Sequence, residues 1–170
     1  IDAQKAQLVG LSFAVETGKA AYVPLGHSYM GVPQQLDRDS VLAAFKPLLE
    51  DPNKQKICQH GQYDMNVLMH YGIELRGQAY DTMLESYVLD ATATRHDMDS
   101  LALKYLGRGT IRFEDIAGKG AKQLSFNQIA IEQAGPYAAE DADITLRLHQ
   151  TLLDKLSATP SLRKVLDEIE

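Results

Sequence analysis

The sequence is poor in the residues and patterns that mark secreted proteins, membrane proteins and proteins that coat nucleic acid. A single cysteine, Cys58 in the apolar-flanked "KICQ", excludes an internal disulfide. No apolar run is long enough to span a bilayer, and no signal-peptide pattern appears. Positive charge is scarce, since the formal net charge is −6, and this argues against broad, salt-driven adhesion to nucleic acid. We therefore expect a soluble cytoplasmic protein without a membrane partner, whose nucleic-acid contacts are local.

The length and apolar content are those of one compact domain. At 170 residues and 45% hydrophobic, the chain can bury a substantial core but is short for two domains. We therefore treat residues 1–170 as a single domain. The chain opens with Ile1 and has no start methionine, so it resembles an excerpt from a longer protein. Its last helix would then lead toward a missing neighbour.

Hydrophobic periodicity predicts an α/β domain. Residues 7–26 alternate around a turn at Thr17 and Gly18, which predicts a β-hairpin. A short strand is expected at "KICQ" and another before Asp81, which stands at the N-cap of the next helix. Helices are predicted over residues 37–53 with Pro47 ending or kinking the regular part, 63–72, 82–90, 97–107, 127–135, from Pro136 to 156, and 159–170. Early strands followed by interleaved helices favour a layered domain with a mixed sheet.

Two aspartates occupy positions where apolar residues are expected. In a helix that starts at Pro136, the core-facing stripe contains Asp141 in line with Tyr137, Ile144, Leu148 and Leu152. Asp64 stands one turn before the apolar stripe of its own helix. An ionised carboxylate there is costly unless a cation, a metal or several donors meet it. The spacing leaves two readings open: a site for hard divalent cations, or structural pairing with Arg, Lys or a neighbouring helix end.

Three segments together resemble a known family. They are "YDMNVLMHYGIELRGQAYDTMLESYVL", "RHDMDSLALKYLG" and "PYAAEDADITLRLH", and they are similar to the 3′-to-5′ proofreading exonuclease domain of the bacterial family A repair polymerase, DNA polymerase I. The likeness runs from Leu8 onward. It implies a ribonuclease H-like α/β fold, with a mixed sheet covered by helices on both faces. It also implies four acidic residues that bind two divalent metal ions (Mg, Mn or Zn).

The resemblance assigns roles to particular residues. Asp64 matches the aspartate of the family's second motif, and Tyr137 and Asp141 match its third motif, Tyr-x-x-x-Asp. Asp64 and Asp141 would ligate metal, and Tyr137 would hold the attacking water. Two ions about 3.5 to 4 Å apart can activate that water and stabilise the leaving oxygen. Residues expected to contact the DNA are Phe113 by stacking on the frayed 3′ end, His60 with its neighbour Gln59, Arg95 with His96, and Ile1 as an apolar wedge.

The family's first motif, Asp-x-Glu on the opening strand, is absent from the sequence. Matching the hairpin places that strand just upstream of Ile1, in the middle of the sheet, so we expect the first central strand to be missing from this sequence. The remaining pair of carboxylates offers about two negative charges against the four positive charges of two ions, so at best one ion should bind, and weakly. We expect this fragment to have little or no nuclease activity. His60 stands where the family has Asn.

Three functions compete at this stage. The leading prediction is a metal-dependent proofreading exonuclease that hydrolyses the 3′-terminal phosphodiester of single-stranded or frayed DNA. Its partners would be a DNA 3′ end and the polymerase domain of the same parent chain, in the cytoplasm of a bacterium beside the nucleoid. The alternatives are a catalytically silent, structural domain of a polymerase and an RNA-trimming exonuclease of the same superfamily. Five cations between residues 104 and 122 (Lys104, Arg108, Arg112, Lys119 and Lys122) could form a strand-binding rim or a plain solvated face.

Overall fold

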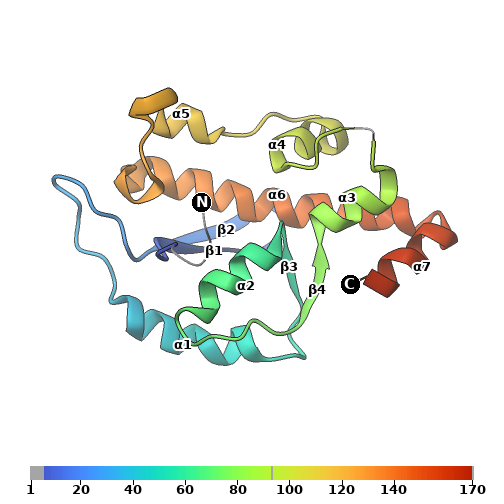
Figure 1. Cartoon of the computed structure of the whole chain (residues 1–170), viewed down its shortest axis with the longest axis horizontal. Helices are drawn as coiled ribbons and strands as arrows, with labels where there is room; N and C mark the ends of the chain where they lie inside the picture. The colour runs from blue at the N-terminus through green and yellow to red at the C-terminus, as the bar shows by residue number, and fades with distance from the viewer. Residues whose placement is uncertain (1–5, 93, 170) are drawn as a thin grey trace.

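The computed structural model of the protein describes residues 6–92 and 94–169 (Figure 1). Ile1, expected to wedge the terminal bases, lies outside these residues. In chain order the elements are β1 (Gly10–Glu16), β2 (Lys19–Pro24), α1 (Arg38–Glu50), β3 (Lys56–Cys58), α2 (Gly61–Met69), β4 (Gln78–Asp81), α3 (Thr82–Asp90), α4 (Met98–Leu101), the π-helical turn η1 (Ala102–Leu106), α5 (Phe113–Ala117), the 3₁₀ turns η2 (Gly120–Lys122) and η3 (Phe126–Gln128), α6 (Ile131–Ser157) and α7 (Pro160–Ile169).

The strands form two separate pairs in the described part of the chain. β1 and β2 make the antiparallel hairpin that the alternation predicts, and Gly18 closes its turn with φ +81°. β3 and β4 pair in parallel, with Ile57 opposite Tyr80. No ladder joins the two pairs, so β1 and β3 each have one unpaired edge among the described residues. The predicted mixed character, antiparallel and parallel, is present, but as two small sheets.

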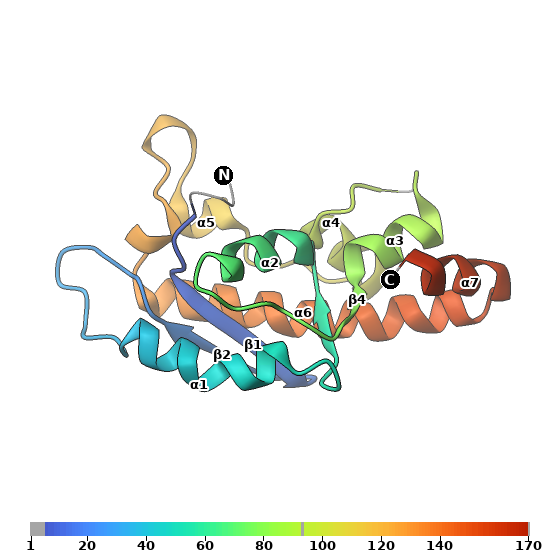
Figure 2. The same ribbon diagram turned by 60° about the horizontal axis from the view of Figure 1, so that its bottom comes forward.

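Helices cover both faces of the hairpin, as the predicted fold class requires (Figure 2). On one face, α1 and α2 pack through Leu42, Leu49, Val67 and Leu68 against hairpin side chains such as Phe13. On the other face lies α6, which runs the length of the molecule and contacts both strands. Burial of these leucine and valine side chains stabilises the layers by about 1.5 to 3 kcal/mol per side chain.

The long helix α6 begins earlier than predicted. The sequence favoured a short helix over 127–135 and a second helix from Pro136, but one helix runs from Ile131, with Pro136 inside it. Pro136 lies near the start of the helix, where its missing N–H removes only one backbone hydrogen bond. The same reasoning applies to α1, which continues past Pro47 to Glu50 instead of ending there. Leu49, buried in the core, holds that last turn in place.

The remaining helix predictions are confirmed with small changes. Asp37 accepts the backbone N–H of Ser40 at 2.9 Å and caps α1. Asp97 does the same for α4, which changes into η1 before Gly107 ends it with φ +64°. A second core joins α4 and η1 to α6 through Leu101, Ile144 and other apolar residues. The predicted C-terminal helix is present as α7, packed on α3 and α6.

Candidate functional site

Asp141 is a carboxylate without a partner in a negatively charged setting. It lies on α6 and is half-buried, and neither of its side-chain oxygens makes a hydrogen bond or an ion pair with another described residue. Burial, and then the charges of Asp99 and Glu140, raise its pKa to about 7. Tyr137, one turn earlier, has its pKa raised by burial, Asp141 and Asp99. The two residues therefore share one environment, as their spacing predicts.

Asp64 is exposed, unlike the half-buried Asp141, so the prediction that it stands at a core-facing position of its helix is wrong. It lies in the first turn of α2, and solvent reaches its carboxylate although protein surrounds it. This surrounding, together with the charge of Asp81, raises its pKa to about 6, while His60 acts in the opposite direction. The thiol of Cys58 is adjacent, since Asp64 and Asp81 both raise its pKa in addition to the effect of burial. Asp64 makes no ion pair or hydrogen bond with another described side chain.

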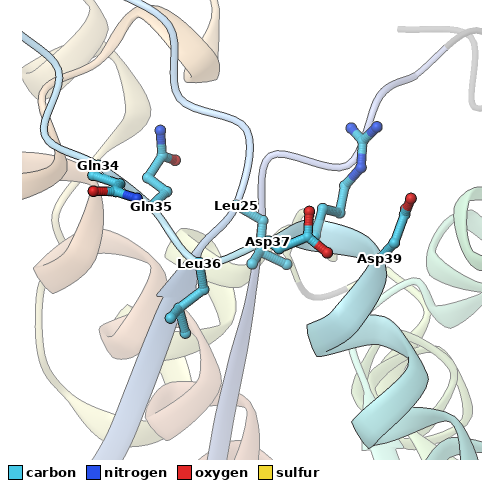
Figure 3. Close-up of a pocket in the computed structure, with 7 residues that line it drawn as sticks. Leu25, Gln34, Gln35, Leu36, Asp37 and Asp39 are labelled. Atoms are coloured by element: carbon cyan, nitrogen blue, oxygen red, sulfur yellow. The ribbon is translucent and has the colours of Figure 1, made fainter.

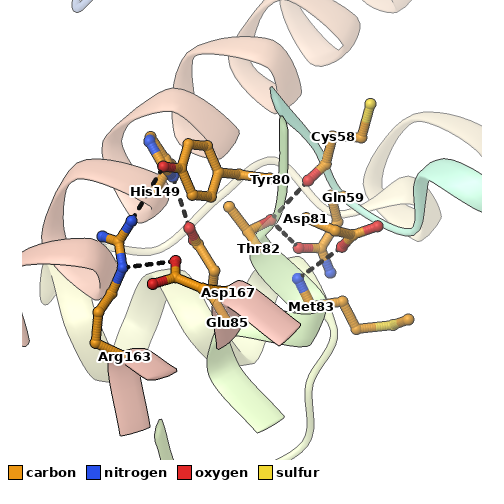
Figure 4. Close-up of polar contacts among 10 residues, drawn as sticks. All are labelled: Cys58, Gln59, Tyr80, Asp81, Thr82, Met83, Glu85, His149, Arg163 and Asp167. Atoms are coloured by element: carbon orange, nitrogen blue, oxygen red, sulfur yellow. Dashed lines mark hydrogen bonds and ion pairs between the residues drawn. The ribbon is translucent and has the colours of Figure 1, made fainter. Parts of the chain in front are cut away.

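Asp81 has the structural role that its position predicts. Its carboxylate is buried and accepts the N–H of Met83 at 2.9 Å, which caps α3. Figure 4 shows the bond to Met83, and the carboxylate also accepts the N–H groups of His60 at 3.1 Å and Gly61 at 2.7 Å, so it holds the start of α2 as well. The N-cap prediction is confirmed, and the capping extends to a second helix.

Different charges raise the pKa values of the two carboxylates: Asp81 acts on Asp64, and Asp99 and Glu140 act on Asp141, each in addition to burial. Neither carboxylate is among the charges that shift the pKa of the other. Within residues 6–92 and 94–169, no three His, Cys, Asp or Glu side chains come together in an arrangement that could hold a metal ion. Yet the alternative reading, structural pairing with Arg or Lys, is not observed for either residue in the same part of the chain. Both carboxylates keep the oxygen donors and the unbalanced charge that suit a hard cation.

Asp143, two residues after Asp141, shows what a structural aspartate looks like on the same helix. Its oxygens accept the N–H of Gly18 and the Nε–H of Arg147, both at 2.7 Å. These donors hold its pKa below the usual range despite its partial burial. The hairpin turn is fixed to α6 by these contacts, whereas Asp141 fixes nothing.

Aromatic rings form a wall beside Tyr137. Phe113 and Phe126 lie with their ring centroids 6.2 and 6.0 Å from that of Tyr137. Behind Phe126, the Tyr22 hydroxyl lies 2.6 Å from Nε2 of the buried His27, whose Nδ1 lies 3.0 Å from the Ile129 carbonyl oxygen. Burial lowers the pKa of His27, so the neutral ring donates to Ile129 and accepts from Tyr22. Through these two hydrogen bonds, His27 connects the segment just before α6 to the hairpin.

The other predicted DNA contacts lie around the start of α2. His60 is exposed and adopts φ +60°, the left-handed region, where it is the sole residue other than glycine among those described. Histidine enters this region more readily than most residues. Gln59 is anchored by Thr82, whose hydroxyl donates to its Oε1, and its own amide donates to the His96 carbonyl oxygen at 3.0 Å.

Arg95 and His96 differ in how free they are. Arg95 is exposed and pairs with Asp97 at 3.2 Å. His96 is committed to the fold, because its ring stacks on Tyr87 with centroids 3.6 Å apart and its two nitrogens lie within 3.1 Å of the Ser86 hydroxyl and the Ala91 carbonyl oxygen. A phosphate contact at Arg95 stays a prediction.

The suggested basic rim is largely neutralised. Lys104 lies 3.8 Å from Asp90, Arg108 lies 3.8 Å from Glu140, and Lys119 lies 3.1 Å from Glu114. Glu114 lies in the same stretch as the cations, residues 104–122, whereas Asp90 and Glu140 come from outside it. The surface therefore carries less positive charge than the local sequence indicates.

Two hollows on the described part of the chain do not contain the predicted catalytic residues. The larger, about 570 Å³, is lined by Leu25 and residues 34–39 at the entry of α1 (Figure 3). The smaller, about 230 Å³, is lined by Met65, Gln78, Tyr80, Asp81, Leu84 and Ile169. Asp64, Tyr137 and Asp141 line neither of them.

Sequence reasoning missed two residues next to Asp141. Asp99, in "DMDSL", and Glu140, directly before Asp141, both raise the pKa of that carboxylate. Glu140 could have been noticed, since it adjoins the third motif in "PYAAED". Asp99 resembles an ordinary acid in the first turn of a helix, and only the packing of α4 on α6 brings it close.

Comparison with known proteins decides the family. A family model described as "3'-5' exonuclease" matches residues 1–157. The chain belongs to this 3′-5′ exonuclease family. It is 76% identical over its whole length to DNA polymerase I of Pseudomonas aeruginosa and 41% identical to DNA polymerase I of Rhizobium leguminosarum. It spans only 19% and 18% of these two relatives, which are larger polymerase chains. The resemblance drawn from the three motifs is confirmed, as is the enzyme class it implies.

Solved structures support the fold. The exonuclease-family chain superposes with a TM-score of 0.69 on a structure titled "POL domain of Pol1 from M. smegmatis complex with DNA primer-template and dNTP", at 22% identity, covering 96% of this chain and 24% of that one. With "Brucella melitensis NrnC" the TM-score is 0.67 at 19% identity, covering 97% and 74%. The ribonuclease H-like fold class is thereby confirmed. In the described part of the chain, no helix has the length and apolar character needed to cross a bilayer.

Proposed function

We propose that the chain is the part of a bacterial DNA polymerase that removes nucleotides from the 3′ end of single-stranded or frayed DNA by metal-dependent hydrolysis. The observation that carries the proposal is Asp141. In a chain of the exonuclease family, this carboxylate sits one turn from Tyr137, has no partner among the described residues, and has its pKa raised to about 7 by burial and by negative neighbours. A structural aspartate such as Asp143 has none of these features.

The residues of the proposed site would have different roles in metal binding, water orientation and base stacking. Asp64 and Asp141 would hold divalent ions, which are drawn to oxygen ligands in negative surroundings. Such ions, when bound, supply a nucleophilic water and stabilise the leaving oxygen. The Tyr137 hydroxyl, which makes no hydrogen bond to another described residue, would orient the attacking water. Phe113 would stack on the terminal base, a contact that tolerates any sequence.

The donor set of the described residues is incomplete for two ions. Different charges act on Asp64 and on Asp141, and no cluster of three metal-binding side chains is found between residues 6 and 169, residue 93 excepted. β1 and β3 have unpaired edges in the same part of the chain. A strand that carries Asp-x-Glu could pair with them and bring two more carboxylates. We therefore propose that the 170-residue chain alone hydrolyses DNA poorly.

A chimaera tests the proposal. The residues that precede the matching region of P. aeruginosa DNA polymerase I would be joined to Ile1, and degradation of a 3′-labelled single-stranded oligodeoxynucleotide would be followed with Mg²⁺, with Mn²⁺ and with EDTA. We expect hydrolysis with metal, slower by at least about 100-fold in the unextended chain. Equal rates with and without metal would overturn the metal dependence. No hydrolysis by the chimaera would overturn the catalytic proposal and favour a silent domain.

Two substitutions in the chimaera assign the roles. Asp141→Ala should abolish hydrolysis and keep the fold, since it removes an unpaired charge, and unchanged activity would exclude Asp141 as a ligand. Tyr137→Phe should lower kcat with little change in metal affinity.

Matched oligonucleotides with deoxy and ribo 3′ ends distinguish DNA trimming from RNA trimming. A site that discriminates at the 2′-hydroxyl group changes the ratio of the two degradation rates. A location beside the nucleoid, and a partner polymerase domain in the parent chain, follow from the same proposal.

A further inference from the structure

The connection between η1 and α5, residues 107–112, has little of its own to hold it in place. It has no helix or strand, and Gly107, Arg108 and Gly109 are exposed. A Cβ atom placed on Gly109 would meet no atom within 4 Å. A loop with so few contacts opens easily unless side chains from elsewhere bind it.

Two carboxylates outside the loop provide such contacts. One oxygen of Glu140, on α6, accepts the backbone N–H of Ile111 at 2.7 Å, and its other oxygen lies 3.8 Å from the Arg108 guanidinium. Asp99, on α4, accepts the hydroxyl hydrogen of Thr110. Of these, the bond to the Ile111 N–H is the firmest, because it is short, charge-assisted and partly buried, whereas Arg108 is almost half exposed.

The Glu140 contact links two parts of the proposed site. Ile111 stands two residues before Phe113, and Glu140 stands three residues after Tyr137 and directly before Asp141. The rings of Phe113 and Tyr137 lie 6.2 Å apart, centroid to centroid, at an angle of 59°. Phe113 is the first residue of the five-residue helix α5 and packs against the cluster of Ala117, Ile129 and Ala134, so the loop before it sets where the helix that carries the ring begins.

We propose that Glu140 is a positioning residue, which binds the loop at Ile111 to α6 and thereby keeps the Phe113 ring beside Tyr137. The positioning is a property of the chain alone. Its consequence for substrate, that the terminal base of a DNA 3′ end stacks on a ring already in place, rests on the proposed function. A loosened ring would lower affinity for DNA, because the loop would have to be ordered on binding.

The absence of tryptophan from the chain allows a direct test. Phe113→Trp introduces a single indole at the ring in question, and acrylamide quenching of its fluorescence measures how freely solvent reaches it. In this background we compare Glu140→Ala, Glu140→Gln and Asp154→Ala. The glutamine keeps a carbonyl oxygen to accept the Ile111 N–H, and Asp154 is an exposed acid on the same helix whose side chain touches nothing in this site.

Glu140→Ala should raise the quenching constant about twofold or more, while Glu140→Gln and Asp154→Ala leave it within error of the parent. A second measurement avoids the introduced indole: in chains that keep Phe113, limited trypsin cleavage after Arg108 and Arg112 should accelerate several-fold in Glu140→Ala only. Thermal melts check that global stability is retained. Unchanged quenching and cleavage in Glu140→Ala, or equal effects of alanine and glutamine, would overturn the positioning role.

Adding a single-stranded oligodeoxynucleotide in EDTA separates this inference from the proposed function. If the introduced indole is quenched by DNA, and Glu140→Ala weakens the apparent affinity while Glu140→Gln does not, both stand. If Glu140→Ala loosens the loop but DNA leaves the indole unaffected, the positioning stands and the stacking role of Phe113 fails.

Discussion

Asp81 and Glu85, at the start of α3, are more deeply buried than Asp64 and Asp141, yet only the first two have hydrogen-bond partners, Glu85 through Oε1 alone. Asp81 accepts three backbone N–H groups, and Glu85, which is fully buried, lies 2.7 Å from Nδ1 of His149 (Figure 4). Asp64 and Asp141 make no such contact within the described residues. The difference separates two uses of acidic residues: those of α3 hold the fold together, and the other two keep charge available for a ligand.

The partnered region has further support around it. The Tyr80 ring lies against His149 with centroids 4.5 Å apart, and Arg163 of α7 reaches the Tyr80 hydroxyl at 3.4 Å and Asp167 at 2.8 Å. Here β4, α3, α6 and α7 meet. Replacing a member of this group should therefore destabilise the folded protein, whereas replacing the Asp64 or Asp141 carboxylate should stabilise it.

The largest expected effect is the loss of the buried pair. Glu85→Ala leaves His149 buried without its carboxylate and should lower the free energy of unfolding by about 3 to 5 kcal/mol, measured by urea denaturation. The matched Glu85→Gln keeps an acceptor for the His149 ring and should cost about 1 to 2 kcal/mol. A loss below about 1 kcal/mol in the alanine variant would contradict the view that this pair is structural.

A smaller loss is expected at Asp81. Asp81→Ala removes the acceptor of three N–H groups at the starts of α2 and α3 and should destabilise the protein by about 2 to 3 kcal/mol in the same assay. Asp37→Ala serves as the control, because Asp37 caps only α1 and is exposed, and it should destabilise the protein less than Asp81→Ala does. If both variants lose the same free energy of unfolding, Asp81 does not stabilise the start of α2.

Replacing Asp141 is expected to stabilise the protein, in contrast to the replacements of Glu85 and Asp81. Its folded pKa, about 7, lies above the ordinary value of 3.8, so the folded state binds the proton more tightly than the unfolded state between these values. Stability from this group is full below about pH 4 and is lost as the pH rises through 7. In EDTA at about pH 8, Asp141→Asn should stabilise the protein by about 1 to 2 kcal/mol, a figure reduced for partial solvent access. A variant no more stable than the parent at pH 8 would contradict the raised pKa.

The smallest change is expected at Asp64. Its pKa is raised only to about 6, and solvent reaches it, so Asp64→Asn should raise the melting temperature at pH 8 by less than Asp141→Asn does. The stabilities of parent and variant should converge near pH 4. If Asp64→Asn is the more stabilising of the two, the order of burial inferred for the two carboxylates is wrong.

Local signals in the sequence predicted much of the fold. The hairpin followed from alternation about Thr17 and Gly18, and the caps of three helices followed from Asp37, Asp81 and Asp97, since each acts within one turn of its own position. The predicted helix start at Pro136 was wrong, because a proline removes one local hydrogen bond while packing elsewhere along the helix outweighs that loss, whereas α1 ends at Glu50, within the predicted range.

The sequence by itself therefore determined the elements, the family and the unusual placing of Asp141 on an apolar stripe, because these depend on residues a few positions apart. Tertiary structure alone decided the rest. It split the strands into two pairs, placed Asp99 beside Asp141, and put Asp81 beside Asp64. Such neighbours come from distant segments, and their contacts depend on how layers pack, which no local pattern records.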